Sequence, residues 1–389
     1  MPRKPGMKIA YLSDMDPRQG WSYSGGNTRI LNALEGVADV TVLSQRWGKL
    51  EPLRRLLHRM PDSINLRLRW RLHLLFAPFI AREVAKELAK DRYDALVCAY
   101  SFHALAKVRL PYPMLRVFTS DATPTVYKRS EIGRAFGSFL SISRLMDRWI
   151  LRHERAVMRA NDLNLWPSEW QSDGASAIYG LGADKSVILP WGANVSDPGT
   201  PGPLPEIGPD RPLRLLLVGR DWQMKGGPLA VAVISALRAR GIAAELDVIG
   251  CHPGGYDGRS EIRFHAYLDK TKPAELARFE QLFRQAHFLI GPSFESYGFA
   301  FCEASAYALP ALCLDIGGIP VFDGENGLVL SADADAELFC EAIEPFLTNP
   351  DSYAALRASA RRVYETQLNW PAWADRAVDL MRERIRAKS

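Results

Sequence analysis

Residues 213–249 read LRLLLVGRDWQMKGGPLAVAVISALRARGIAAELDVI, which is an apolar strand pattern, a glycine-rich turn, a helix pattern and a second strand pattern. The two apolar runs cover 213–218 and 244–249, and the helix pattern through 229–240 stops at Gly241. Further apolar runs follow around Leu289, Leu312 and Leu328. This alternation of strands and helices is typical of a doubly wound parallel sheet, so an α/β fold is predicted.

The first half of the chain repeats the alternation more loosely. Its apolar strand patterns lie, in chain order, at 8–12, 40–43, 95–98, 115–118 and 163–166. Between the halves, residues 196–205 are rich in prolines and glycines that discourage both helix and strand. We therefore expect two Rossmann-like domains, 1–196 and 212–370, joined by a linker at 197–211. A last helical segment, 371–389, is expected to pack back on the first domain.

The composition is that of a globular enzyme. The 389 residues are 47% hydrophobic and 24% charged, which excludes a disordered or fibrous class and leaves room for two domains. The five cysteines lack the spacing of a zinc site or redox motif. The first apolar segment, 7–12, is too short for a signal peptide, and no stretch approaches the roughly 20 apolar residues of a spanning helix. We expect a cytoplasmic protein, with peripheral attachment to the inner face of the cytoplasmic membrane as an option.

Positive charge is concentrated in one segment of the first half, although the net charge is only +5. Glu51 and Asp62 are its acidic residues, whereas its basic ones are Arg46, Lys49, Arg54, Arg55, Arg59, Arg67, Arg69 and Arg71. Such a patch suits membrane headgroups, a lipid-phosphate acceptor or nucleic acid. The alternative is a solvated face whose arginine stems cover apolar surface. Of the partners, we expect an anionic membrane surface and no nucleic acid.

A glycine-rich loop after the strand at 213–218 carries two cations. Arg220 and Lys225 lie five residues apart there, and Pro228 suits the first turn of the following helix. Open α/β sheets bind ligands at the carboxyl ends of their strands, and two cations at that edge are well placed to hold a diphosphate.

A second strand-to-helix turn brackets a glycine with two carboxylates. Residues 294–304 read FESYGFAFCEA, so that Glu295 and Glu303 stand on either side of Gly298 and of a helix start at Phe299 and Ala300. A glycine that lets the backbone approach a ligand and a helix N-terminus suited to anions are the parts of a phosphate cradle. A hydrolase acid and base pair is the alternative for the two carboxylates, but the adjacent cations favour nucleotide binding.

In the first domain, a short loop after the first strand contains the glycine pair Gly25 and Gly26. The pair either lets the backbone approach a diphosphate or belongs to a flexible loop in which Asn27 or Thr28 caps a helix. Asp14, at the end of the first strand, is interpreted as a cap or a contact to a substrate.

The combined motifs resemble the family-four retaining glycosyltransferases of the GT-B fold. The resemblance rests on Gly219-Arg220 with Lys225-Gly226, on the E-x7-E run about 70 residues later, and on Ala308-Leu309-Pro310. It extends to residues 162–170, 179–180 and 190–194, which match the end of that family's first domain. The resemblance implies that Glu303 accepts hydrogen bonds from ribose hydroxyls, that Glu295 faces the transferred sugar, and that Arg220 and Lys225 hold the diphosphate. It implies no metal and no cofactor beyond the nucleotide-sugar co-substrate.

Two departures from that family concern reactivity and specificity. Many members carry a first-domain histidine near the sugar, where this chain has Asp121 in the run Ser120-Asp121-Ala122-Thr123, which resembles a bacterial subgroup with an Asp-Ala-Thr motif. Asp121 would orient the acceptor or the sugar, or else cap a loop. The second departure is Val321, which follows Pro320 where the family often has glutamate.

The resemblance implies transfer of a hexose-like sugar from a nucleoside diphosphate to a glycan or lipid-linked acceptor, in bacterial polysaccharide or glycoconjugate synthesis. The first domain would bind the acceptor and the second the donor, across a cleft. A nucleotide-sugar epimerase or phosphorylase of the same fold is one alternative, and a non-catalytic glycan-binding or membrane-binding protein is the other.

Overall fold

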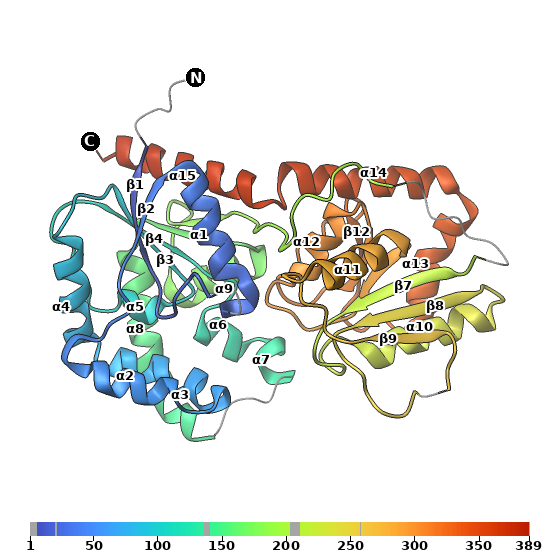
Figure 1. Ribbon diagram of the computed structural model, residues 1–389, viewed down its shortest axis with the longest axis horizontal. Helices are drawn as coiled ribbons and strands as arrows, with labels where there is room; N and C mark the ends of the chain where they lie inside the picture. Colours follow the sequence, from blue (N-terminus) through green and yellow to red (C-terminus); the bar gives the residue numbers. More distant parts are fainter. Residues whose placement is uncertain (1–5, 20–21, 136–140, 203–210, 257, 389) are drawn as a thin grey trace. The chain divides into compact units, whose positions relative to one another are not determined.

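The computed structural model describes residues 6–388 apart from 20–21, 136–140, 203–210 and 257, and it divides into two compact units (Figure 1). Unit 1 contains residues 1–129, 138–190 and 370–389, and unit 2 contains 130–137 and 191–369. Residues 191–196 thus group with unit 2, whereas the sequence assigns them to the first domain. Most of the expected linker, 203–210, lies outside the described residues.

Unit 1 is built on a six-stranded parallel sheet with the order β2-β1-β3-β4-β5-β6. Neighbouring strands pair in parallel register, for example Ile9 with Val40 on one side and with Ala95 on the other. The central strands are almost wholly buried because helices cover both faces of the sheet. The strands are β1 Lys8–Leu12, β2 Asp39–Val42, β3 Ala95–Ala99, β4 Leu115–Thr119, β5 Leu163–Trp166 and β6 Ser186–Ile188.

The helices of unit 1 include the C-terminal helix of the chain. This helix, α15 (Trp370–Arg386), packs against α1 (Gly26–Val37). The other helices are α2 Glu51–His58, α3 Asp62–Leu75, α4 Ala77–Leu88, α5 Phe102–Leu105, α6 Pro124–Arg129, α8 Asp147–Ala160 and α9 Glu169–Tyr179, with 3-10 turns at Ser22–Gly25, Gly48–Leu50 and Ser141–Met146. Within the described residues, no helix has the length and apolar character needed to cross a membrane.

Unit 2 repeats the architecture with the strand order β12-β11-β10-β7-β8-β9, again with parallel pairing between neighbouring strands. Its strands are β7 Leu213–Val218, β8 Ala244–Ile249, β9 Ile262–His265, β10 Phe288–Gly291, β11 Ala311–Leu314 and β12 Gly327–Leu330. Its helices are α7 Glu131–Ala135, α10 Gly227–Ala239, α11 Pro273–Gln285, α12 Phe299–Ala306, α13 Ala336–Thr348 and α14 Pro350–Thr366. The predicted α/β architecture of two parallel sheets is confirmed.

The strand order marks one position in each sheet where a ligand is expected. In unit 1 the chain leaves β1 toward β2 and returns to the other side of β1 at β3. In unit 2 it leaves β7 toward β8 and returns to the other side of β7 at β10. Open α/β sheets bind ligands at such switch points, outside the carboxyl ends of the two strands.

Candidate active site

The loop after β7 brings Lys225 to the switch point of unit 2. Gly226, the residue before α10, has a left-handed φ of 71°, and a Cβ on it would lie 2.1 Å from the carbonyl oxygen of Pro292. A Cβ on Gly219 would lie 2.3 Å from Cγ of Lys225, so the lysine stem folds closely over this glycine. The two glycines therefore permit a tight loop that directs the Lys225 ammonium group toward β10.

The segment after β10 supplies Glu295 from the other side of the switch point. A short parallel bridge joins Glu295 to Gly317, and the N–H of Gly318 donates to the Glu295 carbonyl at 3.1 Å. Gly317 has a φ of 78°, and a Cβ there would lie 2.0 Å from that carbonyl oxygen. The carboxylate of Glu295 pairs with Nζ of Lys225 and accepts from Oγ of Ser293 at 3.4 Å. The structure thus joins two residues that the sequence predicted for one site.

A small hollow lies beside this ion pair, at the carboxyl ends of β7 and β10. Its lining includes Lys225, Gly291, Ser293, Glu295 and Ala300. Gly298, with a φ of 86°, precedes the first residue of α12 and allows the sharp turn into that helix. The first turn of a helix presents unsatisfied N–H groups and the positive end of the helix dipole. The hollow therefore combines an ammonium group, a carboxylate and a helix N-terminus.

Glu303 lies one turn inside α12 and is 3% exposed. Its Oε1 pairs with Nζ of Lys270, which comes from the loop between β9 and α11. Sequence reasoning missed Lys270, because nothing in its spacing links it to residue 303. Arg220 is exposed and places its guanidinium 4.4 Å from the ring centroid of Tyr267, in the same loop as Lys270.

The first-domain candidates lie in unit 1. Gly25 precedes α1 with a φ of 83°, and Gly26 is the first, buried residue of that helix. Asn27 therefore lies inside α1, where it donates to Oγ of Ser13 at 3.0 Å, so the alternative in which it caps the helix is wrong. Asp121 follows β4. Burial, together with the charge of Asp121, raises the pKa of the Tyr100 hydroxyl well above its usual range.

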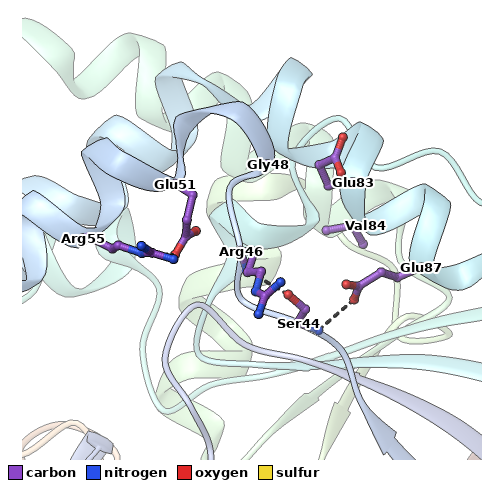
Figure 2. Close-up of a pocket in the computed structure, with 8 residues that line it drawn as sticks. All are labelled: Ser44, Arg46, Gly48, Glu51, Arg55, Glu83, Val84 and Glu87. Atoms are coloured by element: carbon purple, nitrogen blue, oxygen red, sulfur yellow. Dashed lines mark hydrogen bonds and ion pairs between the residues drawn. The ribbon is translucent and has the colours of Figure 1, made fainter.

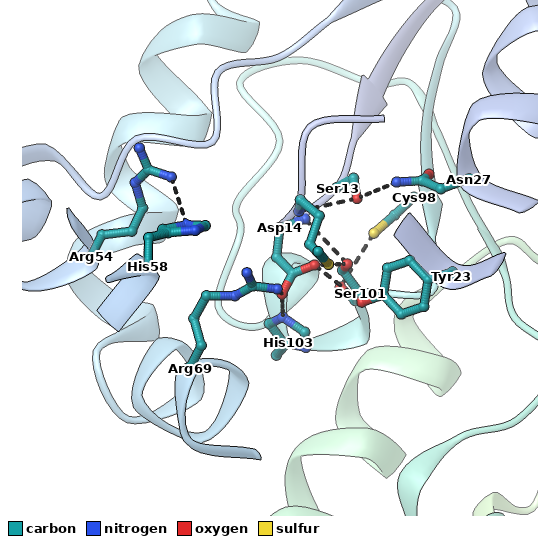
Figure 3. A network of polar contacts seen from close by, with 11 residues as sticks. Ser13, Asp14, Tyr23, Asn27, Arg54, His58, Arg69, Cys98, Ser101 and His103 are labelled. Carbon is teal, nitrogen blue, oxygen red and sulfur yellow. Dashed lines mark hydrogen bonds and ion pairs between the residues drawn. The ribbon is translucent and has the colours of Figure 1, made fainter. Parts of the chain in front are cut away.

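Asp14 is the centre of a buried polar network at the switch point of unit 1 (Figure 3). It accepts hydrogen bonds from Ser101 Oγ at 2.6 Å, Tyr23 OH at 3.2 Å and Arg69 Nη2 at 3.0 Å, and it contacts His103 Nε2 at 2.9 Å. Burial alone would raise the pKa of Asp14, but His103 and Arg69 lower it well below its usual range. Asp14 therefore connects the end of β1 to three other segments of unit 1 instead of capping a helix.

A pocket of about 390 Å³ lies beyond the end of β2 in unit 1 (Figure 2). Its walls include Glu51, Glu83 and Glu87, and each already has a partner. Hydrogen bonds from Arg54 lower the pKa of Glu51 to about 2. Lys86 pairs with Glu83 at 2.8 Å, and Ser44 N donates to Glu87 at 2.8 Å. We assign no ligand to this pocket.

Comparison with known proteins supports the fold and shows a family match within unit 2. Residues 212–349, most of unit 2, match the family model described as glycosyl transferases group 1. Over nearly its whole length the chain resembles sucrose-phosphate synthase from Thermosynechococcus elongatus, with a TM-score of 0.65, 18% identity and coverage of 98% of this chain and 100% of that one. HepE from Anabaena, solved in complex with UDP, gives a TM-score of 0.63, 13% identity and coverage of 97% and 100%.

The curated relatives match over a smaller part of their length than the structural neighbours do. A D-inositol 3-phosphate glycosyltransferase of Gordonia bronchialis is 26% identical over 248 residues, which are 59% of this chain and 53% of the relative. One from Rhodococcus erythropolis is 29% identical over 180 residues, 45% of this chain and 35% of the relative. The chain thus spans about half the length, or less, of these relatives.

The two parallel sheets and these structural neighbours define a protein of the GT-B class. Residues 212–349 match the glycosyl transferases group 1 model, which supports a glycosyltransferase of this fold. The predicted resemblance is confirmed at this level, whereas the Asp-Ala-Thr subgroup stays a prediction.

Proposed function

We propose that the protein is a retaining glycosyltransferase that moves a sugar from a nucleoside diphosphate to a glycan or lipid-linked acceptor. The observation that carries the proposal is the Lys225–Glu295 pair at the switch point of unit 2, beside the N-terminus of α12. The family match of unit 2 and the UDP complex of one structural neighbour support a nucleotide-sugar donor. The name of the curated relatives, D-inositol 3-phosphate glycosyltransferase, adds a polyol phosphate as a further acceptor class to be tested.

In this proposal, the charges of the site act on the leaving group. Breaking the bond between sugar and phosphate develops negative charge on the diphosphate. Lys225 has three N–H donors, so it can keep its contact with Glu295 and still donate to a phosphate oxygen. The N-terminus of α12 adds fixed dipoles, and the charges on this chain stabilise the leaving group without a metal. Glu295 would face the sugar, and Glu303 would accept from the ribose.

Retention of configuration belongs to the proposal through the resemblance to the family-four enzymes. The acceptor hydroxyl would attack on the face that the diphosphate leaves, with the phosphate taking the acceptor proton. Unit 1 would bind the acceptor, with Asp121 orienting it and with Gly25 and Gly26 near the donor diphosphate.

The outer faces of three helices in unit 1 favour a membrane as the second partner. Arg69 is buried against Asp14, and Arg54 forms an ion pair with Glu51. These two arginines therefore do not contribute free positive charge to the predicted basic surface. Large apolar side chains take their place beside the remaining cations: Leu56 on α2, Leu75 on α3 and Phe79 on α4 are 55%, 57% and 58% exposed. The exposed cations are Arg59 and Arg55 beside Leu56, and Arg82 near Phe79; Arg55 is 72% exposed although it lies 3.5 Å from Glu51. Together with the apolar side chains they form faces that suit an anionic lipid surface. We propose peripheral attachment through α2, α3 and α4.

The test of the catalytic proposal is donor consumption. The protein is incubated with a panel of nucleoside-diphosphate sugars, with and without glycan or polyol phosphate acceptors, and products are followed by mass spectrometry. We expect loss of one donor only when an acceptor is present, and turnover reduced about 100-fold or more in Lys225→Ala and Glu303→Ala. An epimerised donor or a sugar phosphate formed without acceptor would instead support the epimerase or phosphorylase alternative.

A further inference from the structure

The carboxylate of Glu303 depends on one cation for its charge balance. Its side chain is 5% exposed, and Lys270 pairs with Oε1. Among the described residues, no donor is found for Oε2. A buried carboxylate without a partner is costly, so the position of the Glu303 side chain rests on Lys270.

The turn that carries Lys270 is fixed by its own hydrogen bonds. Asp269 accepts from the N–H and the hydroxyl of Thr271 at 3.0 and 2.7 Å, and its own N–H donates to Glu275 in the first turn of α11 at 2.6 Å. The ammonium group of Lys270 also lies 5.0 Å from the ring centroid of Phe279 in α11. Lys270 is thus directed at Glu303 by a structured loop, while its side chain stays 30% exposed.

We propose that Lys270 is a positioning residue that makes the donor site selective for ribose. By holding Oε1 of Glu303, it leaves Oε2 oriented to accept the ribose hydroxyls of the nucleotide. The site then recognises the two ribose hydroxyls through the Lys270–Glu303 ion pair and not through Glu303 alone. This inference rests on the proposed function, because it assumes that unit 2 binds a nucleoside diphosphate.

The experiment measures the coupling between Lys270 and the ribose hydroxyls. Nucleoside diphosphates with each base are first titrated into the wild-type protein by calorimetry. The one that binds is then compared with its 2′,3′-dideoxy counterpart in Lys270→Met, Lys270→Arg and Lys272→Met. Lys272→Met is the matched control, because it removes the same charge from the same loop, where Lys272 is 62% exposed and pairs with Glu275 at 2.9 Å.

We expect the wild type to prefer the ribonucleotide by tenfold or more, since hydrogen bonds to a charged group contribute about 1.5–3 kcal/mol. In Lys270→Met the ribonucleotide should bind about tenfold more weakly while the dideoxynucleotide binds as before, so that the preference largely disappears. Lys270→Arg should restore most of the preference, and Lys272→Met should keep it. Melting temperatures of the variants separate these effects from unfolding.

Two results would overturn the inference while leaving the proposed function intact. Equal weakening of both nucleotides in Lys270→Met would show a general charge effect, and unchanged or tighter ribonucleotide binding would show that Lys270 only covers Glu303. A wild-type protein that binds none of the diphosphates would contradict the proposed function itself, and with it this inference.

Discussion

At the scale of single residues, the candidate site depends on backbone positions that only glycine fills without strain. Gly317 is the sharpest case, because its left-handed conformation allows its backbone to lie directly against Glu295. A Cβ there would lie 2.0 Å from the backbone carbonyl oxygen that anchors Glu295, and 2.6 Å from Cδ1 of Ile132. The glycine thereby fixes where the Glu295 carboxylate meets Lys225.

We predict that Gly317→Ala abolishes donor turnover. Gly324→Ala is the matched control, since Gly324 has a similar φ of 72° but nothing within 4 Å of an added Cβ. Both variants should lose about 1–2 kcal/mol of unfolding free energy from the left-handed backbone alone. In urea unfolding, only Gly317→Ala should lose more unfolding free energy than the left-handed backbone accounts for. Only this variant should also lose donor turnover. Normal turnover in Gly317→Ala would show that Glu295 reaches its position without the close backbone contact at Gly317.

A second residue-scale prediction concerns Glu154 on α8, which accepts from the N–H of Thr125 at 3.0 Å. Burial raises the pKa of Glu154 to about 7. The folded-state pKa of Glu154 lies above the unfolded value. The contribution of the Glu154 side chain to the free energy of unfolding is therefore fully present below about pH 4.5 and is lost as the pH rises through about 7. Chemical unfolding of the wild type between pH 5 and 7 should therefore show a loss approaching 1.4 kcal/mol per pH unit that Glu154→Gln lacks. The same slope in both proteins would contradict this assignment.

At the scale of elements, α3 shows what periodicity can and cannot predict. Leucines and arginines alternate over residues 66–74 as in a strand, yet the segment is helical, as the surrounding pattern indicates. Its buried positions Asn65, Arg69 and His73 are polar and four residues apart, because this face turns toward the Asp14 network. Polar residues thus occupy buried positions that a helix usually fills with apolar ones, so the helical periodicity of the apolar residues is weak in this segment.

The strand-to-helix turns of unit 2 were more predictable. Glycine-rich turns after apolar strands located Lys225, Glu295 and Gly298 correctly at one edge of the sheet. Lys270 and Gly317 were not predicted as parts of the site, because they reach it from other strand ends, through contacts that leave no local pattern. Asp14 was interpreted as a cap or substrate contact because its partners lie 9 to 89 residues away in the sequence.

The membrane proposal is tested on the helices that carry it. Leu56→Ser combined with Phe79→Ser should strongly reduce flotation with vesicles containing anionic lipid, because the apolar anchors are removed while the cations stay. Leu338→Ser is the control, since Leu338 is 44% exposed on α13 of unit 2. Wild-type binding should fall with added salt. Binding that ignores lipid charge and salt, or that survives the double change, would contradict attachment through these helices.

At the scale of the whole molecule, the two units repeat one architecture, and each has charged groups at its switch point. In unit 1 the buried Asp14 satisfies its charge with internal partners. In unit 2 the Lys225–Glu295 pair lines a hollow beside a helix N-terminus. This difference is the reason for placing the donor in unit 2, where the family match also lies.

The most direct test of that placement is equilibrium titration of nucleoside diphosphates and their sugars into the wild type, Lys225→Met and Lys272→Met. We predict saturable binding of one nucleotide by the wild type and by Lys272→Met, and binding at least tenfold weaker in Lys225→Met, from the loss of a charge-assisted hydrogen bond to phosphate. Equal affinity in all three proteins, or binding of no nucleotide at all, would contradict a donor site at the switch point of unit 2.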